Sequence, residues 1–299
     1  MTFTTDLRKV TIGLFIIFIV ACSKDLDIAP PGPPNNDEKV QQTEIIAKLA
    51  GYDTIENGYY LPSRAAETDK IKVRTYLKSL IDLLSLPPLE HNYVTGNGQA
   101  GTNIYAILPA TVNSNEYIIV GAHYDSVNGS PGANDNATGV AMIFGLIKKL
   151  KKVPMRNKSV IFVFFDDEEI GLVGSGEFAE KILLDSLNVH SVHTADQMGW
   201  DNDGDRAIEL EAPTDYLKDK YQAAALENNI PVHITQSVSD HASFRSRGFN
   251  AIGLTEEYVN GDTTPYYHGA GDTYPTINFD YLTSSTLLMS KVISNILSE

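Results

Sequence analysis

The feature that most constrains the fold is an unbroken apolar run at residues 160–165 that ends directly in four acidic residues. Such a run is typical of a strand buried on both faces of a sheet. The acids Asp166, Asp167, Glu168 and Glu169 follow it without a spacer. If that strand end is buried, four carboxylates repel one another and their pKa values rise, unless a cation lies among them. A solvated acidic turn is the simpler alternative, and this segment alone leaves both open.

Strand and helix patterns alternate around this run. Apolar residues recur at helical spacing in several segments, with short apolar stretches between them. The expected helices include residues 45–49, 71–84, 140–150, 214–228 and 279–297, and the expected strands include 103–108, 117–120, 160–165 and 251–254. Buried strands separated by helices predict a single-domain α/β/α sandwich with a mixed, largely parallel central sheet. In such sheets, ligands bind at the carboxyl ends of the strands.

The N-terminal segment is typical of an export signal. Arg8 and Lys9 precede an apolar run at residues 12–21 that is too short to span a bilayer as a helix. This run ends in Ala21-Cys22 and resembles the bacterial lipobox, in which the cysteine is lipidated; a plain cleaved signal with an incidental cysteine is the alternative. Cys22 is the single cysteine, so no disulfide can form within the monomer. We therefore expect a signal peptide at residues 1–21 and a lipid-anchored protein of the cell envelope, in the outer membrane, facing the periplasm or the cell surface.

Residues 22–37 are rich in proline and predict a semi-rigid linker, followed by one folded domain at residues 38–299. The formal net charge of the chain is -15. A protein with this negative charge repels the phosphate backbone of DNA or RNA, so no nucleic acid is expected as a partner. The same charge can mildly favour cationic substrates such as peptide amines, but its simpler role is to keep the protein soluble.

Five short segments place acids and histidines where predicted strands end. In the first, His123 and Asp125 follow the strand at residues 117–120. Residues two apart in an extended chain point to the same side, so Asp125 can accept the ring N–H of His123 and leave the other nitrogen for a metal. In the second, Asp135 precedes a helix, where it can act as a helix cap or approach a metal. Alone, each of these residues can equally be structural.

The third segment is the acidic run after residue 165. The fourth contains Asp196 after a short β-branched stretch, and the fifth contains Tyr267 and His268. Together and in this order, the five segments resemble the zinc aminopeptidases with two co-catalytic metals, whose relatives include glutamate carboxypeptidase and the one-zinc glutaminyl cyclases. The resemblance covers residue 103 to the C-terminus. It implies a zinc-peptidase, phosphorylase/hydrolase-like sandwich.

The resemblance also implies a role for each residue. Two Zn²⁺ per chain are expected, with Asp135 as the bridging ligand. One site is completed by Glu169 and His268, and the other by His123 and Asp196. Glu168 is expected to be the general base, Asp125 the partner of His123, and Tyr267 the residue that steadies the tetrahedral intermediate.

One departure from the family pattern stands in this sequence. The fourth motif more often reads Asp-Met-x-Gly, whereas here Gln197 follows Asp196, so Asp201 is a rival ligand. The segment at residues 239–244 also resembles one that lines the site in this family. Asp201, Asp203 and Asp205 alternate as in a calcium loop, but Arg206 stands where an EF-hand needs glycine, which favours a polar turn.

The chemistry of these residue types agrees with the resemblance. A zinc ion with nitrogen and oxygen ligands and an open position lowers the pKa of its water to about 7. One acid of the adjacent pair Glu168 and Glu169 can then bind metal while the other moves the proton. We expect an aminopeptidase that hydrolyses the first peptide bond of peptides with a free N-terminus. A glutaminyl cyclase, a carboxypeptidase or dipeptidase on the same metal set, and a non-enzymatic binding protein are the alternatives.

Overall fold

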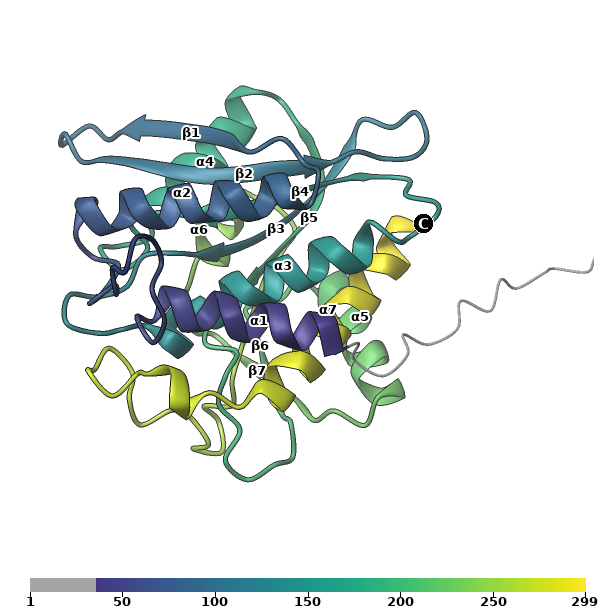
Figure 1. Cartoon of the computed structure of the whole chain (residues 1–299). Coiled ribbons are helices and arrows are strands. Elements are labelled where there is room, and N and C mark those ends of the chain that lie inside the picture. Colours follow the sequence, from purple (N-terminus) through teal and green to yellow (C-terminus); the bar gives the residue numbers. More distant parts are fainter. Residues whose placement is uncertain (1–35) are drawn as a thin grey trace, which may run out of the picture. The chain divides into compact units, whose positions relative to one another are not determined.

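A mixed eight-stranded sheet runs through residues 36–299, the part of the chain that the computed structural model describes (Figure 1). Its strands are β1 (Leu89–Val94), β2 (Ala100–Leu108), β3 (Glu116–His123), β4 (Ser159–Phe165), β5 (Asn188–Ala195), β6 (Ile208–Glu211), β7 (Val232–Thr235) and β8 (Ala251–Thr255). The spatial order is β1-β2-β4-β3-β5-β8-β6-β7. The predicted signal peptide, Cys22 and most of the predicted linker lie outside the described residues.

The centre of the sheet is parallel and its flanks are largely antiparallel. Strands β4, β3, β5 and β8 are paired in parallel. The pairs β1–β2, β2–β4 and β8–β6 are antiparallel, and β7 is parallel to β6. This arrangement confirms the mixed sheet, and it brings the carboxyl ends of the four central strands to one edge.

Helices cover both faces of the sheet. On one face, nearest the viewer in Figure 1, lie α1 (Asn36–Leu49), α2 (Glu67–Leu83) and α3 (Gly139–Leu150), together with α5 (Asp215–Glu227) and α7 (Phe279–Leu297). The other face is covered by α4 (Val173–Leu184) and the short α6 (His241–Arg245). Two further short helical segments are η1 (Ala133–Thr138) and η2 (Tyr274–Thr276).

Strand β4 explains why the sandwich forms. All of its residues are buried, as its apolar composition predicts. Because side chains alternate along a strand, Val160, Phe162 and Phe164 pack in the core beneath α3, while Ile161, Val163 and Phe165 pack against α4 and α6. A strand that is apolar on both sides is stable only between two helical layers.

Helix α3 is buried over most of its surface between the sheet, α1 and α7. Its last turn carries Lys148 and Lys149, whose charges complement the negative end of the helix dipole. Within residues 36–299, none of the helices combines the length and the apolar character needed to cross a membrane.

Candidate metal centre

The carboxyl ends of β3, β4 and β5 bring the predicted residues together. His123 is the last residue of β3, the acidic run starts directly after β4, and Asp196 directly follows β5. Because the three strands are parallel neighbours, these positions meet at one edge of the sheet. Asp135 reaches the same edge from η1, and His268 from the loop that follows β8.

Asp135 lies between two histidines. Its Oδ1 is 3.2 Å from Nε2 of His123, and its Oδ2 is 3.3 Å from Nε2 of His268. On the His268 side, Glu169 Oε2 lies 2.9 Å from the same ring nitrogen. On the His123 side, Asp196 Oδ1 lies 3.4 Å from Nε2. The five residues therefore form two groups of ligand atoms that share Asp135.

The charges of this cluster are unbalanced without a cation. Burial raises the pKa of Glu169 to about 7 and also raises the pKa of Asp196. Although burial opposes it, the neighbouring carboxylates of Glu168 and Asp196 raise the pKa of His123. Nε2 of His123 and Oδ1 of Asp196 are buried and have no hydrogen-bond partner among the described residues. Nitrogen and oxygen donors with unused lone pairs and excess negative charge fit divalent cations such as Zn²⁺.

Asp125 and Glu168 lie next to this cluster. Oδ1 of Asp125 is 3.4 Å from Nδ1 of His123, the ring nitrogen that faces away from Asp135. The carboxylate of Asp125 also accepts the backbone N–H groups of Glu168 and Glu169, at 3.1 Å each. Asp125 thus connects the histidine at the end of β3 to the acidic turn after β4. The carboxylate of Glu168 lies 4.0 Å from Nε2 of His123, and burial raises its pKa to about 9.

The four acids after β4 divide into two pairs. Glu168 and Glu169 face the metal centre, whereas Asp166 and Asp167 face helix α2. There Lys70 Nζ lies 2.9 Å from Asp166 and 2.5 Å from Asp167. Arg74 lies 3.2 Å from the other oxygen of Asp166. The repulsion expected within the acidic run is therefore relieved for one pair by cations of the protein itself.

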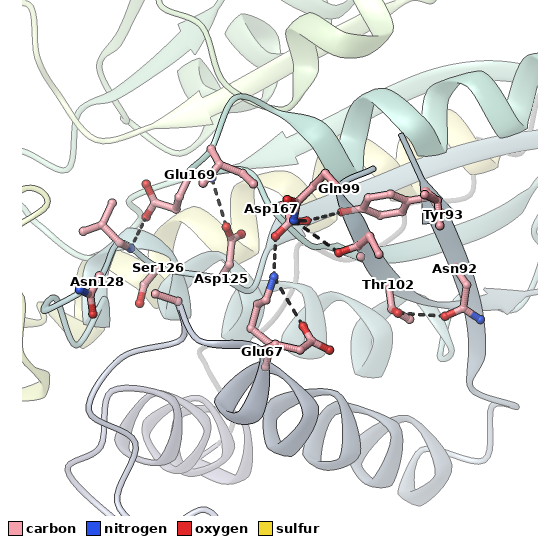
Figure 2. Close-up of a pocket in the computed structure, with 17 residues that line it drawn as sticks. Glu67, Asn92, Tyr93, Gln99, Thr102, Asp125, Ser126, Asn128, Asp167 and Glu169 are labelled. Carbon is pink, nitrogen blue, oxygen red and sulfur yellow. Dashed lines mark hydrogen bonds and ion pairs between the residues drawn. The ribbon is translucent and has the colours of Figure 1, made fainter. Parts of the chain in front are cut away.

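Asp167 also borders a cavity of about 690 Å³, which Figure 2 shows. Tyr93 and Gln99, from β1 and the loop before β2, donate hydrogen bonds to Asp167 at 3.1 and 3.0 Å. Asp125 and Glu169 also line this cavity, so the turn at residues 167–169 lies between it and the metal centre.

Tyr267 and a smaller pocket lie on the open side of the centre. The ring of Tyr267 stacks on His268 at 3.8 Å between centroids, and about half of its surface is exposed. Burial of the remainder raises the pKa of its hydroxyl. Tyr267 lines a pocket of about 360 Å³ together with Asp135, Glu168 and His268.

Asp196 and its rival Asp201 lie in different places. Asp196 is beside His123, and Ser239 Oγ donates to its Oδ2 at 2.9 Å. Asp201 instead groups with Asp203 and Asp205 in a separate loop, where its Oδ1 accepts backbone N–H groups. The geometry favours Asp196 as the ligand.

Two residues that hold the Asp135 segment in place were not predicted from the sequence. The carboxylate of Asp272 accepts the backbone N–H groups of Asn134 and Asp135, at 2.7 and 3.0 Å. Its position four residues after His268, in the same motif, is the signal that could have indicated it.

The side chain of Arg64 is fully buried. It donates to the backbone carbonyls of Leu49, Tyr124, Asp125, Pro131, Gly132 and Asp135. No local pattern marks Arg64.

Comparison with known proteins identifies the family. The sequence profile of peptidase family M28 matches residues 103–293. The chain belongs to peptidase family M28. This membership confirms the resemblance to the co-catalytic zinc aminopeptidases.

Among curated relatives, Aminopeptidase YwaD of Bacillus subtilis (strain 168) is 28% identical over 207 residues, which are 65% of this chain and 44% of that protein. The probable lipoprotein aminopeptidase LpqL of Mycobacterium tuberculosis is 34% identical over 109 residues, 34% of this chain and 22% of that protein. The chain spans about half the length, or less, of these relatives.

Solved structures show the same fold. BSAP, a zinc aminopeptidase from Bacillus subtilis, has a TM-score of 0.77 at 16% identity and covers 87% of this chain and 95% of its own. A glutaminyl cyclase from an Acidobacteriales bacterium has a TM-score of 0.72 at 20% identity, covering 90% of this chain and 97% of its own. The expected sandwich is confirmed. An aminopeptidase, the expected kind of enzyme, and a glutaminyl cyclase, one of the alternatives, both have this fold.

Proposed function

We propose that this chain is a zinc-dependent aminopeptidase that hydrolyses the first peptide bond of peptides with a free N-terminus. The observation that carries the proposal is Asp135, whose two carboxylate oxygens face two different histidines, with Glu168 beside them. This is the arrangement that two co-catalytic metals and a general base require. Membership of family M28 supports the same reaction class.

In this proposal Asp135 would bind both zinc ions. Glu169 and His268 would hold one of them, and His123 and Asp196 would hold the other. When bound, the zinc ions supply Lewis acidity, which polarises the scissile carbonyl and lowers the pKa of water. Asp125 positions His123 through the ring nitrogen that does not bind metal.

Bound zinc cations would hold the carboxyl of Glu168 in its ionised form, although burial raises its pKa in the metal-free protein. The carboxylate of Glu168 then takes up the proton of the attacking water and passes it to the leaving amine. Its position supports this role, because it lines the pocket next to the proposed ligands and its carboxylate lies 4.0 Å from Nε2 of His123. The hydroxyl of Tyr267 lies on the open side of the same pocket and keeps its proton, since burial raises its pKa. It donates a hydrogen bond to the oxygen on which negative charge develops.

The reaction is tested by mass spectrometry of a short peptide mixture incubated with the zinc-loaded protein. The mixture contains an unblocked peptide, its N-acetylated copy and a peptide that begins with glutamine. We expect stepwise loss of residues from the unblocked N-terminus only, abolished by a chelator. Equal cleavage of the acetylated peptide, shortening from the C-terminus, or loss of ammonia from glutamine without shortening would overturn the proposal, the last in favour of a glutaminyl cyclase.

We also propose that Cys22 carries lipid and that residues 22–37 tether the peptidase domain at residues 38–299 to a membrane of the cell envelope. The lipobox-like sequence before Cys22 and the proline-rich spacer after it support this. So does the relative LpqL, a probable lipoprotein aminopeptidase. A Cys22→Ser variant should keep its peptidase activity and leave the membrane fraction. A mature wild-type N-terminus without added lipid mass would contradict the tether.

A further inference from the structure

The pocket of about 360 Å³ extends from the metal centre across the face of the sheet that carries α6. Away from Asp135 and Glu168, its lining is mainly polar and includes Glu211, Thr235, Ser237 and Thr255. Aliphatic character comes from Val238, which is largely exposed. An uncharged aliphatic side chain that entered this pocket would therefore lie against hydroxyl and carboxylate groups.

Glu211 is the charged residue of this inner part. It ends β6, and only 4% of its surface is exposed. Its Oε1 accepts a hydrogen bond from Ser237 Oγ at 2.8 Å. Its Oε2 lies 3.3 Å from Nδ1 of His241, but neither atom has a hydrogen bond within the part of the chain that the structure describes.

The backbone makes room for this carboxylate. Glu211 is paired with Gly253 of β8 in the antiparallel register. A Cβ atom at Gly253 would lie 2.2 Å from Oε2 of Glu211 and 2.6 Å from Nδ1 of His241. A glycine at this position is therefore required for Glu211 and His241 to approach each other beside the pocket.

The charge of Glu211 lacks a cationic partner of its own. Among residues 39–299 it forms no ion pair with lysine or arginine, and its polar neighbours are a hydroxyl and a histidine ring. A buried carboxylate with an unused acceptor is costly unless a cation reaches it. A ligand that brings a positive charge into the pocket supplies that cation.

We propose that Glu211 selects substrates whose first side chain carries a positive charge, lysine or arginine. This inference rests on the proposed aminopeptidase function, because it assigns the pocket beside the metal centre to the first side chain. The ammonium or guanidinium group forms a charge-assisted hydrogen bond with Glu211, and the side-chain hydroxyls of the pocket accept its remaining donors. A leucine side chain gains little binding free energy in this pocket, because it leaves the polar groups of the pocket unpaired.

The test compares three peptides that differ only in their first residue: lysine, norleucine and leucine. Norleucine has the unbranched aliphatic stem of lysine without its ammonium group, so the lysine-to-norleucine ratio of kcat/KM isolates the charge. With the zinc-loaded wild-type enzyme we expect lysine to be preferred by roughly 10-fold or more. In Glu211→Gln the lysine value should fall by about 10- to 100-fold, the range for loss of a charge-assisted hydrogen bond. The norleucine value should stay within about threefold of wild type.

Glu209→Gln is the matched control. Glu209 is buried two residues earlier on the same strand, but it accepts the backbone N–H of Val259 and does not line the pocket. For the Glu209→Gln variant, the ratio of kcat/KM for the lysine peptide to kcat/KM for the norleucine peptide should equal that of the wild type. Cleavage of norleucine by Glu211→Gln shows that this variant is folded and loaded with metal.

The outcomes separate this inference from the proposal on which it rests. A wild type that cleaves all three peptides without preferring lysine, or a Glu211→Gln variant that keeps the wild-type ratio, overturns the inference and leaves the aminopeptidase standing. A wild type that removes no first residue from any of the three overturns both. An equal loss of the ratio in Glu209→Gln also overturns the role of Glu211, because it would show a general effect of charge on β6.

Discussion

Asp135 is the residue on which both halves of the candidate metal centre depend. Its carboxylate faces His123 on one side and His268 on the other. Burial alone would raise its pKa, but the contacts with these two histidines lower it. Its backbone N–H is held by Asp272, and its carbonyl accepts from Arg64. Because hydrogen bonds hold both the backbone N–H and the carbonyl of Asp135, its two carboxylate oxygens can be in position before any metal binds.

The first prediction separates the metal ligands from the general base. Glu168→Gln should keep near-normal zinc content and lose about 10²–10⁴-fold in kcat, because it removes the proton acceptor alone. Asp135→Asn should instead lower the zinc content of both sites, because one of its oxygens is replaced by a nitrogen donor. Metal analysis and steady-state kinetics on the same samples check both. An active Glu168→Gln enzyme, or one purified without zinc, would show that the roles are assigned wrongly.

The second prediction concerns Arg64. Arg64→Met leaves several buried carbonyls without a donor, at about 1–3 kcal/mol for each group left unsatisfied. We expect the variant to lose more than about 3 kcal/mol of unfolding free energy and to bind zinc more weakly, because the chain around Asp135 loses its support. Arg247→Met is the control, since Arg247 pairs with Glu180 at the surface, and it should cost less than about 1 kcal/mol. Denaturant unfolding measures both, and equal losses would contradict the role of Arg64.

At the scale of elements, helix α2 supports the turn that follows β4. Lys70 and Arg74 lie one turn apart on this helix and reach Asp166 from the same side. Asp166 and Asp167 directly precede Glu168 and Glu169 in the same turn. The helix thus neutralises the first half of the acidic run and leaves the second half for the metal centre.

Substitution on α2 tests this support. Lys70→Met leaves the carboxylate of Asp167 buried without a cation, at about 3–5 kcal/mol. It should also lower kcat, because the turn that carries Glu168 shifts. Lys72→Met is the matched control on the same helix: Lys72 forms a 2.7 Å ion pair with Glu56 near the surface, and its loss should cost less than about 1 kcal/mol. Thermal unfolding and kinetics of both variants check the difference, and a Lys70→Met enzyme with wild-type stability would contradict it.

At the scale of the whole molecule, buried acids control how stability depends on pH. Burial raises the pKa of Glu168 to about 9, of Glu256 to about 8 and of Asp240 to about 7. In the unfolded chain these groups ionise near pH 4. Above pH 7 the unfolded chain therefore binds fewer protons than the metal-free folded protein, and stability falls as pH rises.

The prediction is that the metal-free protein unfolds at a lower temperature at about pH 9 than at about pH 7. Partial or full burial lowers the pKa values of His91, His190 and His193, and these groups make stability change with pH in the opposite direction. Their effect is lost only as pH falls below about 6.5, outside this window. Because zinc needs deprotonated ligands, its stabilising effect should grow over the same range. Thermal unfolding with and without zinc measures both trends, and a metal-free protein that gains stability from pH 7 to pH 9 would contradict the assignment of these pKa shifts.

Much of the fold could be predicted because its signals are local. Burial of β4 follows from its apolar run, and α3 and α7 follow from apolar residues at helical spacing. Strand β1 and the short strands β6 and β7 were not predicted. β1 lies at an edge, where half-buried or buried side chains alternate with exposed ones, and it forms a strand because it pairs with β2. Helices α4 and α6 were also missed, because one is interrupted by glycines and the other is very short.

The sequence by itself determined which residues stand at the ends of the central strands, because each acid or histidine ends its strand or directly follows it along the chain. His123, Asp196 and the acidic run could therefore be assigned to one edge of a parallel sheet. Only the tertiary structure decided how the charges are shared. Lys70 comes from a helix far from the acidic run in sequence, and the antiparallel pairing of β6 places Glu211 over Gly253. Electrostatic partners are set by the distance between charges in space, and the periodicity of the sequence does not predict that distance.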